Sequence, residues 1–228
     1  MHNDFGIVAL LPLKANSTRV KGKNFRDFNG KPLFRWVLDT LLSVREIGKV
    51  VINTDARHIL EKNGLKASRR VIIRDRKPEL CGDDVSMNLV LADDVASVPA
   101  SFYIMTHITN PLLSADTVKV AIAKFTDPKS SHTFDSLFTV NRFQARFYRA
   151  DGSPVNHDPG NLIPTQELEP WYEENSNLYL FTAESFGKTK ARIGERPMMM
   201  ETPSDESIDI DDVADWKIAL ALARSFND

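Results

Sequence analysis

A stretch rich in lysine and arginine near the start of the chain is the first candidate for chemistry. Residues 14–35, "KANSTRVKGKNFRDFNGKPLFR", contain seven basic side chains and a single acid, Asp27. They directly follow the apolar run "FGIVALLPL", which is typical of a buried strand. The loop after the first strand of an open α/β sheet is a common ligand site. This position therefore favours a binding loop.

The composition of this loop suits a polyphosphate. Small residues and Gly22 let backbone N–H groups approach phosphate oxygens, while Lys14, Arg19 and Lys23 neutralise the negative charge. A solvated basic loop is the alternative interpretation. Neither of two familiar phosphate motifs explains the loop. The sequence has no G-x-G-x-x-G after its first apolar run, and Thr182 stands where a Walker A motif ending in "GKT" would need glycine.

Two aspartates near the other end of the sequence are candidate metal ligands. Asp209 and Asp211 alternate in "DID", so both carboxylates of an extended segment can face one ion. Mg²⁺ prefers a few carboxylates together with phosphate oxygens and water. The alternative is that Asp211 or Asp212 caps the last helix. No His or Cys cluster has zinc spacing, and no G-x-S-x-G elbow suggests a hydrolase.

Short apolar runs alternate with helical patterns, which predicts a mostly parallel sheet covered by helices on both faces. We expect a single domain over residues 1–228, with an α/β fold of three α/β/α layers. The expected strands are residues 6–13, 49–55, 71–75, 101–109, 177–186 and 196–202, and the expected helices are 32–42, 85–98, 114–125 and 212–226. Residues at about 140–175 break this rhythm with Pro, Gly, Asn and aromatic residues. We interpret them as an excursion that packs on something, such as a partner subunit.

The overall composition is that of an ordinary globular chain of 228 residues with a net charge of -2. This charge argues against a nucleic-acid-coating surface. The single Cys81 rules out an intramolecular disulfide and fits a reducing compartment. The first apolar run is too short to span a bilayer, and "MHND" before it lacks the positive region of a signal peptide. We therefore expect a cytoplasmic protein with no membrane or nucleic-acid partner.

Several stretches resemble one enzyme family, the sugar-acid cytidylyltransferases that make CMP-sialic acids and CMP-Kdo. "PLKANSTRVKGKN" resembles the family's nucleotide-binding loop P-A-R-G-G-S-K-G-I-P-G-K-N, and the two align without gaps. The segments "NTD", "RKPELCGDDVS", "HITNPLLSAD", "NSNLY" and "SIDIDDVADWKIA" are similar to later family segments, in the same order. The sequence departs from the family pattern at Lys14, His107, Leu113 and Ser176, where the family usually has Arg, Gln, Arg and Gly.

The resemblance implies a Rossmann-like nucleotidyltransferase fold, a homodimer and transfer of CMP from CTP to a 3-deoxy-2-ulosonic acid, with Mg²⁺ as the metal. It assigns roles by position: catalysis to Lys14, Lys23 and Asp211; CTP binding to Lys14, Asn16, Ser17, Arg19, Lys23, Asn24 and Ser86; sugar contacts to His107, Asn110 and Asn175; and the metal to Asp209 and Asp211. Arg142, Arg146 and Arg149 are candidates for the sugar carboxylate. Two alternatives stay open, namely a nucleotidyltransferase for a sugar or polyol phosphate and a CTP-binding relative without turnover.

Overall fold

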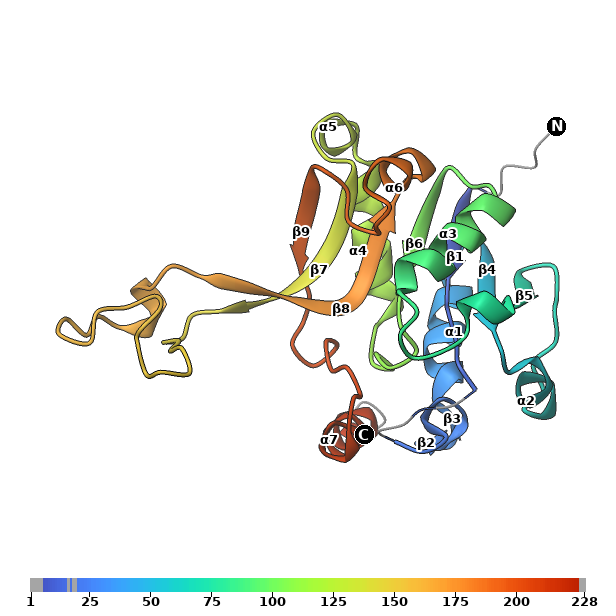
Figure 1. Cartoon of the computed structure of the whole chain (residues 1–228), viewed down its shortest axis with the longest axis horizontal. Coiled ribbons are helices and arrows are strands. Elements are labelled where there is room, and N and C mark those ends of the chain that lie inside the picture. The colour runs from blue at the N-terminus through green and yellow to red at the C-terminus, as the bar shows by residue number, and fades with distance from the viewer. Residues whose placement is uncertain (1–5, 16, 18–19, 226–228) are drawn as a thin grey trace.

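The computed structural model describes residues 6–15, 17 and 20–225. Its centre is a seven-stranded sheet in the order β5-β4-β1-β6-β8-β7-β9 (Figure 1). The strands are β1 (Ile7–Leu10), β4 (Ile47–Thr54), β5 (Val71–Asp75), β6 (Phe102–Met105), β7 (Ser136–Phe143), β8 (Trp171–Phe181) and β9 (Pro197–Glu201). Only β8 runs antiparallel to its neighbours. The predicted mostly parallel α/β sheet is confirmed.

The first strand is buried on both faces. Val8 and Leu10 join one hydrophobic cluster, whereas Ala9 and the following Leu11 join another. All four side chains are fully buried. The apolar run is continuous rather than alternating because a strand in the middle of a parallel sheet meets no water on either face.

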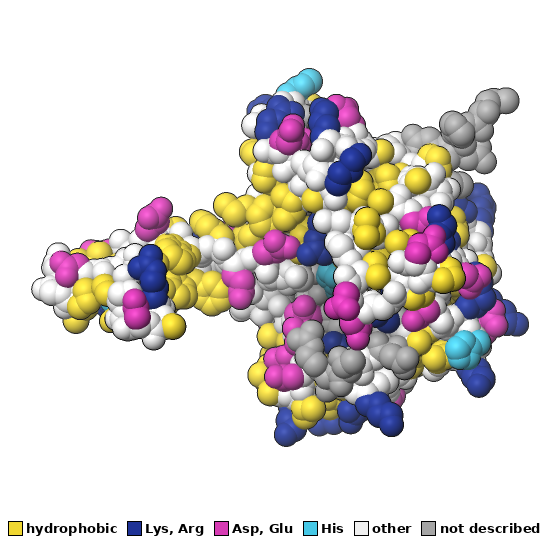
Figure 2. Space-filling view, viewed as in Figure 1, with side chains coloured by type: hydrophobic (Ala, Val, Ile, Leu, Met, Phe, Trp, Pro, Cys, Tyr) yellow, Lys and Arg dark blue, Asp and Glu magenta, His cyan; other side chains and the backbone are white. Residues whose placement is uncertain are grey.

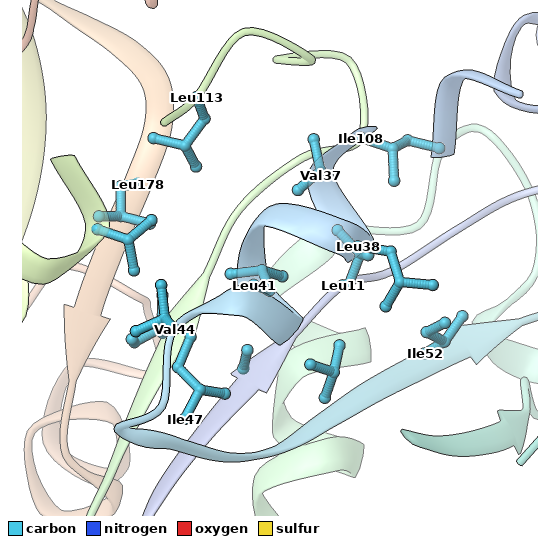
Figure 3. Close-up of a cluster of buried hydrophobic side chains, with 14 of the residues drawn as sticks. Leu11, Val37, Leu38, Leu41, Val44, Ile47, Ile52, Ile108, Leu113 and Leu178 are labelled. Carbon is cyan, nitrogen blue, oxygen red and sulfur yellow. The ribbon is translucent and has the colours of Figure 1, made fainter. Parts of the chain in front are cut away.

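Helices cover both faces of the sheet. α1 (Leu33–Ser43), α2 (Arg57–Lys62) and α4 (Ala115–Thr126) pack on one face, and the cluster beneath α1 is shown in Figure 3. α3 (Met87–Ser97) and α6 (Ala183–Thr189) pack on the other. This arrangement confirms the predicted three layers.

The remaining elements are short or lie beside the sheet. α7 (Val213–Ser225) packs against the small hairpin of β2 (Asp27–Phe28) and β3 (Lys31–Pro32), where Phe28 contacts Trp216 edge-on. The short helix α5 (Pro128–Ser131) follows α4, and the 3-10 turns are η1 (Lys23–Phe25), η2 (Pro78–Leu80) and η3 (Thr165–Glu167). No helix among the described residues is long and apolar enough to cross a membrane.

Helix boundaries follow the local sequence signals. Ser114 caps α4 as expected, because its hydroxyl accepts a hydrogen bond of 3.1 Å from the amide of Thr117. Pro32 lies one residue before α1 rather than inside its first turn.

The predicted excursion forms an arm. β7 and β8 continue as a two-stranded ribbon that leaves the body, and residues 144–170 make its tip (Figure 1). The tip is held by its own contacts: Phe147 stacks on Trp171 with ring centroids 5.1 Å apart, and Nε2 of the Gln144 side chain donates to the carbonyl of Leu168 at 2.9 Å.

The strand boundaries in this arm differ from those expected. β8 begins at Trp171 instead of residue 177, and β7 was not predicted at all. Residues 141–143 and 171–174 are exposed or half-buried, so this part of the ribbon leaves no apolar alternation in the sequence. Residues 136–140 of β7 are mostly buried, and their short run "SLFTV" was overlooked.

Candidate active site

A cavity of about 630 Å³ opens beyond the carboxyl ends of the parallel strands β1, β5 and β6. Parallel strands end at one edge of a sheet, so the loops that follow them meet there. In Figure 2, charged side chains of both signs gather where the arm joins the body. The residues that line the cavity are Pro12, Lys14, Ser17, Lys23, Asn24, Arg76, Asp83, Met87, His107, Ile108, Thr109, Ser176, Arg192, Asp209 and Asp211.

The basic loop after β1 turns two side chains inward. Gly22 has a φ of 64°, in the left-handed region, and its carbonyl accepts the amide of Phe25 at 3.0 Å to start η1. Lys23 and Asn24 follow, with exposed fractions of 6% and 8%. Asn24 donates through Nδ2 to the carbonyl of Lys14 at 2.8 Å, which fixes the shape of the loop. Lys14, Ser17, Lys23 and Asn24 all line this cavity.

The loop is joined to the segment that carries the two predicted metal ligands. The amine of Lys23 donates to the carbonyl of Ile210, and the amide of Ile210 donates to the carbonyl of Thr109 at 2.8 Å. Ile210 is fully buried in a hydrophobic cluster, whereas Asp209 and Asp211 on either side of it line the cavity. The alternation expected of an extended "DID" segment therefore places both carboxylates in the same wall.

The cap of α7 is made by a different aspartate. Asp212 accepts through Oδ1 from the amides of Ala214 at 2.6 Å and Asp215 at 3.0 Å. In return, Asp215 accepts from the amides of Asp211 and Asp212 at 2.9 and 3.0 Å, which is the reciprocal pattern of a capping box. Asp212 is thus the capping residue of α7.

The donor set suits Mg²⁺ better than a transition metal. Among the described residues, no group of three or more His, Cys, Asp or Glu side chains could hold a metal ion. Two carboxylates, Asp209 and Asp211, share a cavity wall. A site of one or two carboxylates that substrate phosphates complete is the usual arrangement for Mg²⁺.

Lys14 lies at the mouth of the cavity. Its amine forms an ion pair of 2.8 Å with Asp83, whose side chain is 70% exposed. The hydrogen bond from Lys14 lowers the pKa of the Asp83 carboxyl below its ordinary value. Such an exposed pair adds little stability, so an anionic ligand can compete for the lysine. Beside it, the carboxylate of Asp55 accepts the amide of Ala15 at 2.7 Å and so holds the loop backbone.

Sequence reasoning missed a buried arginine behind the loop. Arg76 is 8% exposed and donates to the carbonyl and the side-chain oxygen of Asn53 at 2.8 and 3.1 Å. Asn53 in turn donates to Asp94 at 2.8 Å. Burial lowers the pKa of the Arg76 guanidinium. Its position at the start of "RKPELCGDDVS", directly after a predicted strand, was the signal that could have found it.

A second missed arginine lies beside His107. Arg192, from the loop after α6, places Nη1 3.1 Å from Nε2 of His107 and donates through Nη2 to Glu174 at 3.1 Å. Its guanidinium carbon lies 3.9 Å from the centre of the Tyr179 ring. Burial, together with the charges of Arg192 and Lys23, lowers the pKa of His107 to about 3. No pattern in "ARIGERP" predicts this contact, because it joins residues 85 positions apart.

Ser176 has a left-handed φ of 57°. This conformation costs a serine about 1 kcal/mol and is free of strain for the glycine that the family usually has there.

Two predicted sugar contacts lie behind the cavity wall rather than in it. Asn110 is fully buried and donates to the carbonyl of Ile208 at 3.5 Å. Asn175 accepts from Thr139 and donates to Asn141 and Thr202, at 2.7, 2.9 and 2.7 Å. Its amide thus links β7, β8 and the segment after β9.

The remaining predicted residues are distributed as follows. Ser86 is exposed and caps α3 by accepting the amide of Asn88 at 3.3 Å, beside a smaller hollow that Met87 and Arg192 also line. The predicted Asn16 and Arg19 lie outside the described residues. Arg142, Arg146 and Arg149 are carried by the arm, and none of them lines the cavity of their own chain. Arg146 donates instead to the carbonyl of Ile163 at 2.7 Å.

Solved structures share this fold across almost the whole chain. CMP:2-keto-3-deoxy-manno-octonic acid synthetase, solved with CTP, superposes with a TM-score of 0.65 at 17% identity and covers 97% of this chain and 99% of its own. The 4-diphosphocytidyl-2C-methyl-D-erythritol synthase of Anaerococcus prevotii gives a TM-score of 0.66 at 11% identity, with coverage of 96% and 97%. At these sequence identities the structural similarity shows the fold alone.

Sequence comparison gives the family. Pseudaminic acid cytidylyltransferase of Campylobacter jejuni is 25% identical over 227 residues, which are 95% of this chain and 96% of the relative. CMP-N,N'-diacetyllegionaminic acid synthase of Legionella pneumophila is 24% identical over 225 residues, 95% of each chain. These relatives do not favour the sugar- or polyol-phosphate alternative. The model of the cytidylyltransferase family matches residues 8–224. The chain therefore belongs to the cytidylyltransferase family, as the sequence segments indicated.

Proposed function

We propose that this cytidylyltransferase transfers CMP from CTP to the anomeric hydroxyl of a 3-deoxy-2-ulosonic, sialic-acid-like sugar acid. One observation carries the proposal: a single cavity combines the basic loop, the paired carboxylates of the "DID" segment and the polar group around His107. The named relatives that act on pseudaminic and legionaminic acids support the choice of substrate class.

The reaction forms one P–O bond and breaks another. The anomeric oxygen bonds to the α-phosphorus of CTP, the bond from that phosphorus to the bridging oxygen breaks, and pyrophosphate leaves. The hydroxyl proton is lost to a base that the geometry does not identify. Positioning and neutralisation of negative charge supply most of the rate in such transfers. Lys14 and Lys23 provide cations on one side of the cavity, and Ser17 and Asn24 position the triphosphate.

Asp209 and Asp211 would hold Mg²⁺ together with phosphate oxygens of CTP. When bound, the ion neutralises charge on the phosphates. Lys23 positions these carboxylates, because its hydrogen bond to the carbonyl of Ile210 fixes the segment between them. By resemblance, Asn16 and Arg19 extend the triphosphate site, and Ser86 contacts the nucleotide from the start of α3.

The sugar acid would occupy the side of the cavity near His107 and Ser176. Asn110 and Asn175 support this wall from behind. Asn175 precedes Ser176 directly, and its four hydrogen bonds fix the backbone at that point. We therefore assign Asn175 an indirect effect on sugar binding in this chain.

We further propose a homodimer that the arm forms with a second copy. Six large hydrophobic side chains of the arm are at least 36% exposed: Phe143, Tyr148, Leu162, Ile163, Trp171 and Tyr172. A two-stranded ribbon alone is marginally stable, and a contiguous apolar surface of this kind marks an interface. Leu162→Glu should give a monomer in size-exclusion chromatography with light scattering. Val120→Glu, at an equally apolar exposed site on α4, should remain a dimer. Dissociation of both variants would contradict an interface formed by the arm.

The direct test of function is pyrophosphate release from CTP with Mg²⁺ across sialic, legionaminic, pseudaminic and Kdo-type acids. ATP, GTP and UTP serve as nucleotide controls. Release with CTP and one acid supports the proposal and identifies the substrate. CTP binding without release for any acid would contradict the sugar-acid substrate and favour a relative that binds without turnover.

A further inference from the structure

The hydrogen bond between Arg192 and His107 determines the protonation of the histidine. A guanidinium carries five N–H donors and no acceptor. Nε2 of His107, 3.1 Å from Nη1 of Arg192, must therefore accept this bond. An imidazole that accepts at Nε2 is neutral and carries its proton on Nδ1. His107 is thus a hydrogen-bond donor through Nδ1.

Arg192 is held in place before any ligand binds. Its guanidinium stacks on Tyr179 and pairs with Glu174, and the Tyr179 hydroxyl donates to the same oxygen of Glu174. The arginine side chain is only 20% exposed. A stacked and paired arginine loses little further freedom when a ligand arrives. The orientation of His107 is therefore also set in advance.

The field around His107 is positive. Burial lowers the pKa of His107 most, and the charges of Arg192 from the loop after α6 and Lys23 from η1 lower it further, to about 3. The other charged side chains that line the cavity are those of Lys14, Arg76, Asp83, Asp209 and Asp211. Glu174 forms an ion pair with Arg192. A histidine with this pKa is a poor general base near pH 7. The Nδ1–H group of His107 is surrounded by positive charge and instead favours a hydrogen bond to an anionic oxygen.

The chemistry of the proposed substrate places such an oxygen nearby. In a 2-ulosonic acid the carboxylate is attached to the same carbon as the attacking hydroxyl, so it must lie close to the α-phosphorus. Lys23 lies on the side of the cavity proposed for the triphosphate, and its charge also lowers the pKa of His107. We propose that Arg192 is a positioning residue that fixes His107 as a neutral Nδ1–H donor to the carboxylate of the sugar acid. This inference rests on the proposed function, because the sugar acid is its ligand.

The first test needs no turnover. In protein labelled with ¹⁵N-histidine, the protonated and unprotonated nitrogens of a neutral imidazole resonate far apart, and His107→Gln assigns the signal. At pH 7 the wild-type protein should show His107 protonated at Nδ1 alone. Arg192→Met should mix the tautomers or populate the imidazolium. A wild-type His107 protonated at Nε2, or a signal that is the same in Arg192→Met, would overturn the positioning role.

The second test is kinetic. Arg192→Met should raise the KM for the sugar acid about tenfold to a hundredfold, the usual effect of losing a well-placed hydrogen bond to a charged group. The KM for CTP should change by less than about twofold. Arg192→Lys keeps a donor for Nε2, so its KM for the sugar acid should lie between those of the wild-type protein and Arg192→Met. Arg196→Met is the matched control, because Arg196 is an exposed arginine of the same loop outside this cavity.

The two failures are distinguishable. If the wild-type protein releases no pyrophosphate with any acid, the proposed function and the carboxylate contact fail together, while the NMR result still decides whether Arg192 fixes His107. If the wild-type protein turns over but Arg192→Met raises both KM values equally, the arginine has only a structural role. Thermal unfolding of both variants identifies a loss of fold.

Discussion

The protonation of His107 leads to a stability prediction that can be worked out quantitatively. The folded protein keeps this imidazole neutral down to a pKa of about 3, whereas in the unfolded chain the pKa returns to about 6.5. Acidification below pH 6.5 therefore adds a proton to the unfolded state and not to the folded state. Since the unfolded state binds more protons, the free energy of unfolding falls as the pH falls through this window.

The magnitude follows from the two pKa values. Between pH 7 and pH 5 the linkage relation gives a loss of about 2 kcal/mol from His107 alone. His107→Gln removes this contribution while retaining a side chain that can accept from Arg192. The variant should therefore lose about 2 kcal/mol less than the wild-type protein over the same pH step.

Urea unfolding at pH 7 and pH 5 measures the difference, with equal m values confirming that both proteins unfold from the same compact state. His58→Gln, which removes an exposed histidine from α2, controls for the loss of an imidazole as such. Equal losses for the wild-type protein and His107→Gln would refute the reasoning. They would mean that the folded protein does not hold His107 neutral, and the hydrogen bond from Arg192 would then not form in solution.

Three further substitutions test other parts of the site. Asp211→Asn should lower turnover about a hundredfold or more with the fold intact. Asp205→Asn, which changes an exposed aspartate of the same segment, is the control. Full activity of Asp211→Asn at saturating Mg²⁺ would contradict the assignment of Asp211 as a metal ligand. Lys23→Met should weaken CTP binding about tenfold to a hundredfold and reduce its salt dependence, whereas Lys21→Met, at an exposed position of the same loop, should do neither. An affinity unchanged in Lys23→Met would make the loop a surface feature. Asp212→Ala should lower the free energy of unfolding by about 1 kcal/mol, because it removes the cap of α7; an unchanged urea midpoint would contradict the capping box.

Local signals in the sequence predicted the parts of the site that depend on neighbouring residues. The apolar run before Pro12 is a strand because its alternate side chains meet two different cores. The turn at Gly22 and the alternation of Asp209 and Asp211 are likewise set within a few residues. For this reason the sequence alone predicts the basic loop and the paired carboxylates as candidate site residues.

The contacts that the sequence did not reveal join distant segments. Arg76 bonds to the carbonyl of Leu13 across 63 positions, and Arg192 reaches His107 across 85. Both depend on the strand order of the sheet, in which β4 alone separates β5 from β1, and β6 lies beside β8. The outer parts of β7 and β8 escaped prediction for a different reason: their side chains are mostly exposed, so no buried face marks the pairing in the sequence.

The arm and the sugar side of the cavity share one strand. Glu174 pairs with Val140 in the ribbon and holds Arg192 in the cavity wall, and Ser176, two residues on, lines the cavity itself. Asn175 between them is bonded to β7 and to Thr202. A displacement of the ribbon at its root must therefore move the groups around His107, whereas the basic loop and the "DID" segment are joined to each other through Lys23. Docking of the arm on a partner should accordingly affect the sugar wall more than the triphosphate wall.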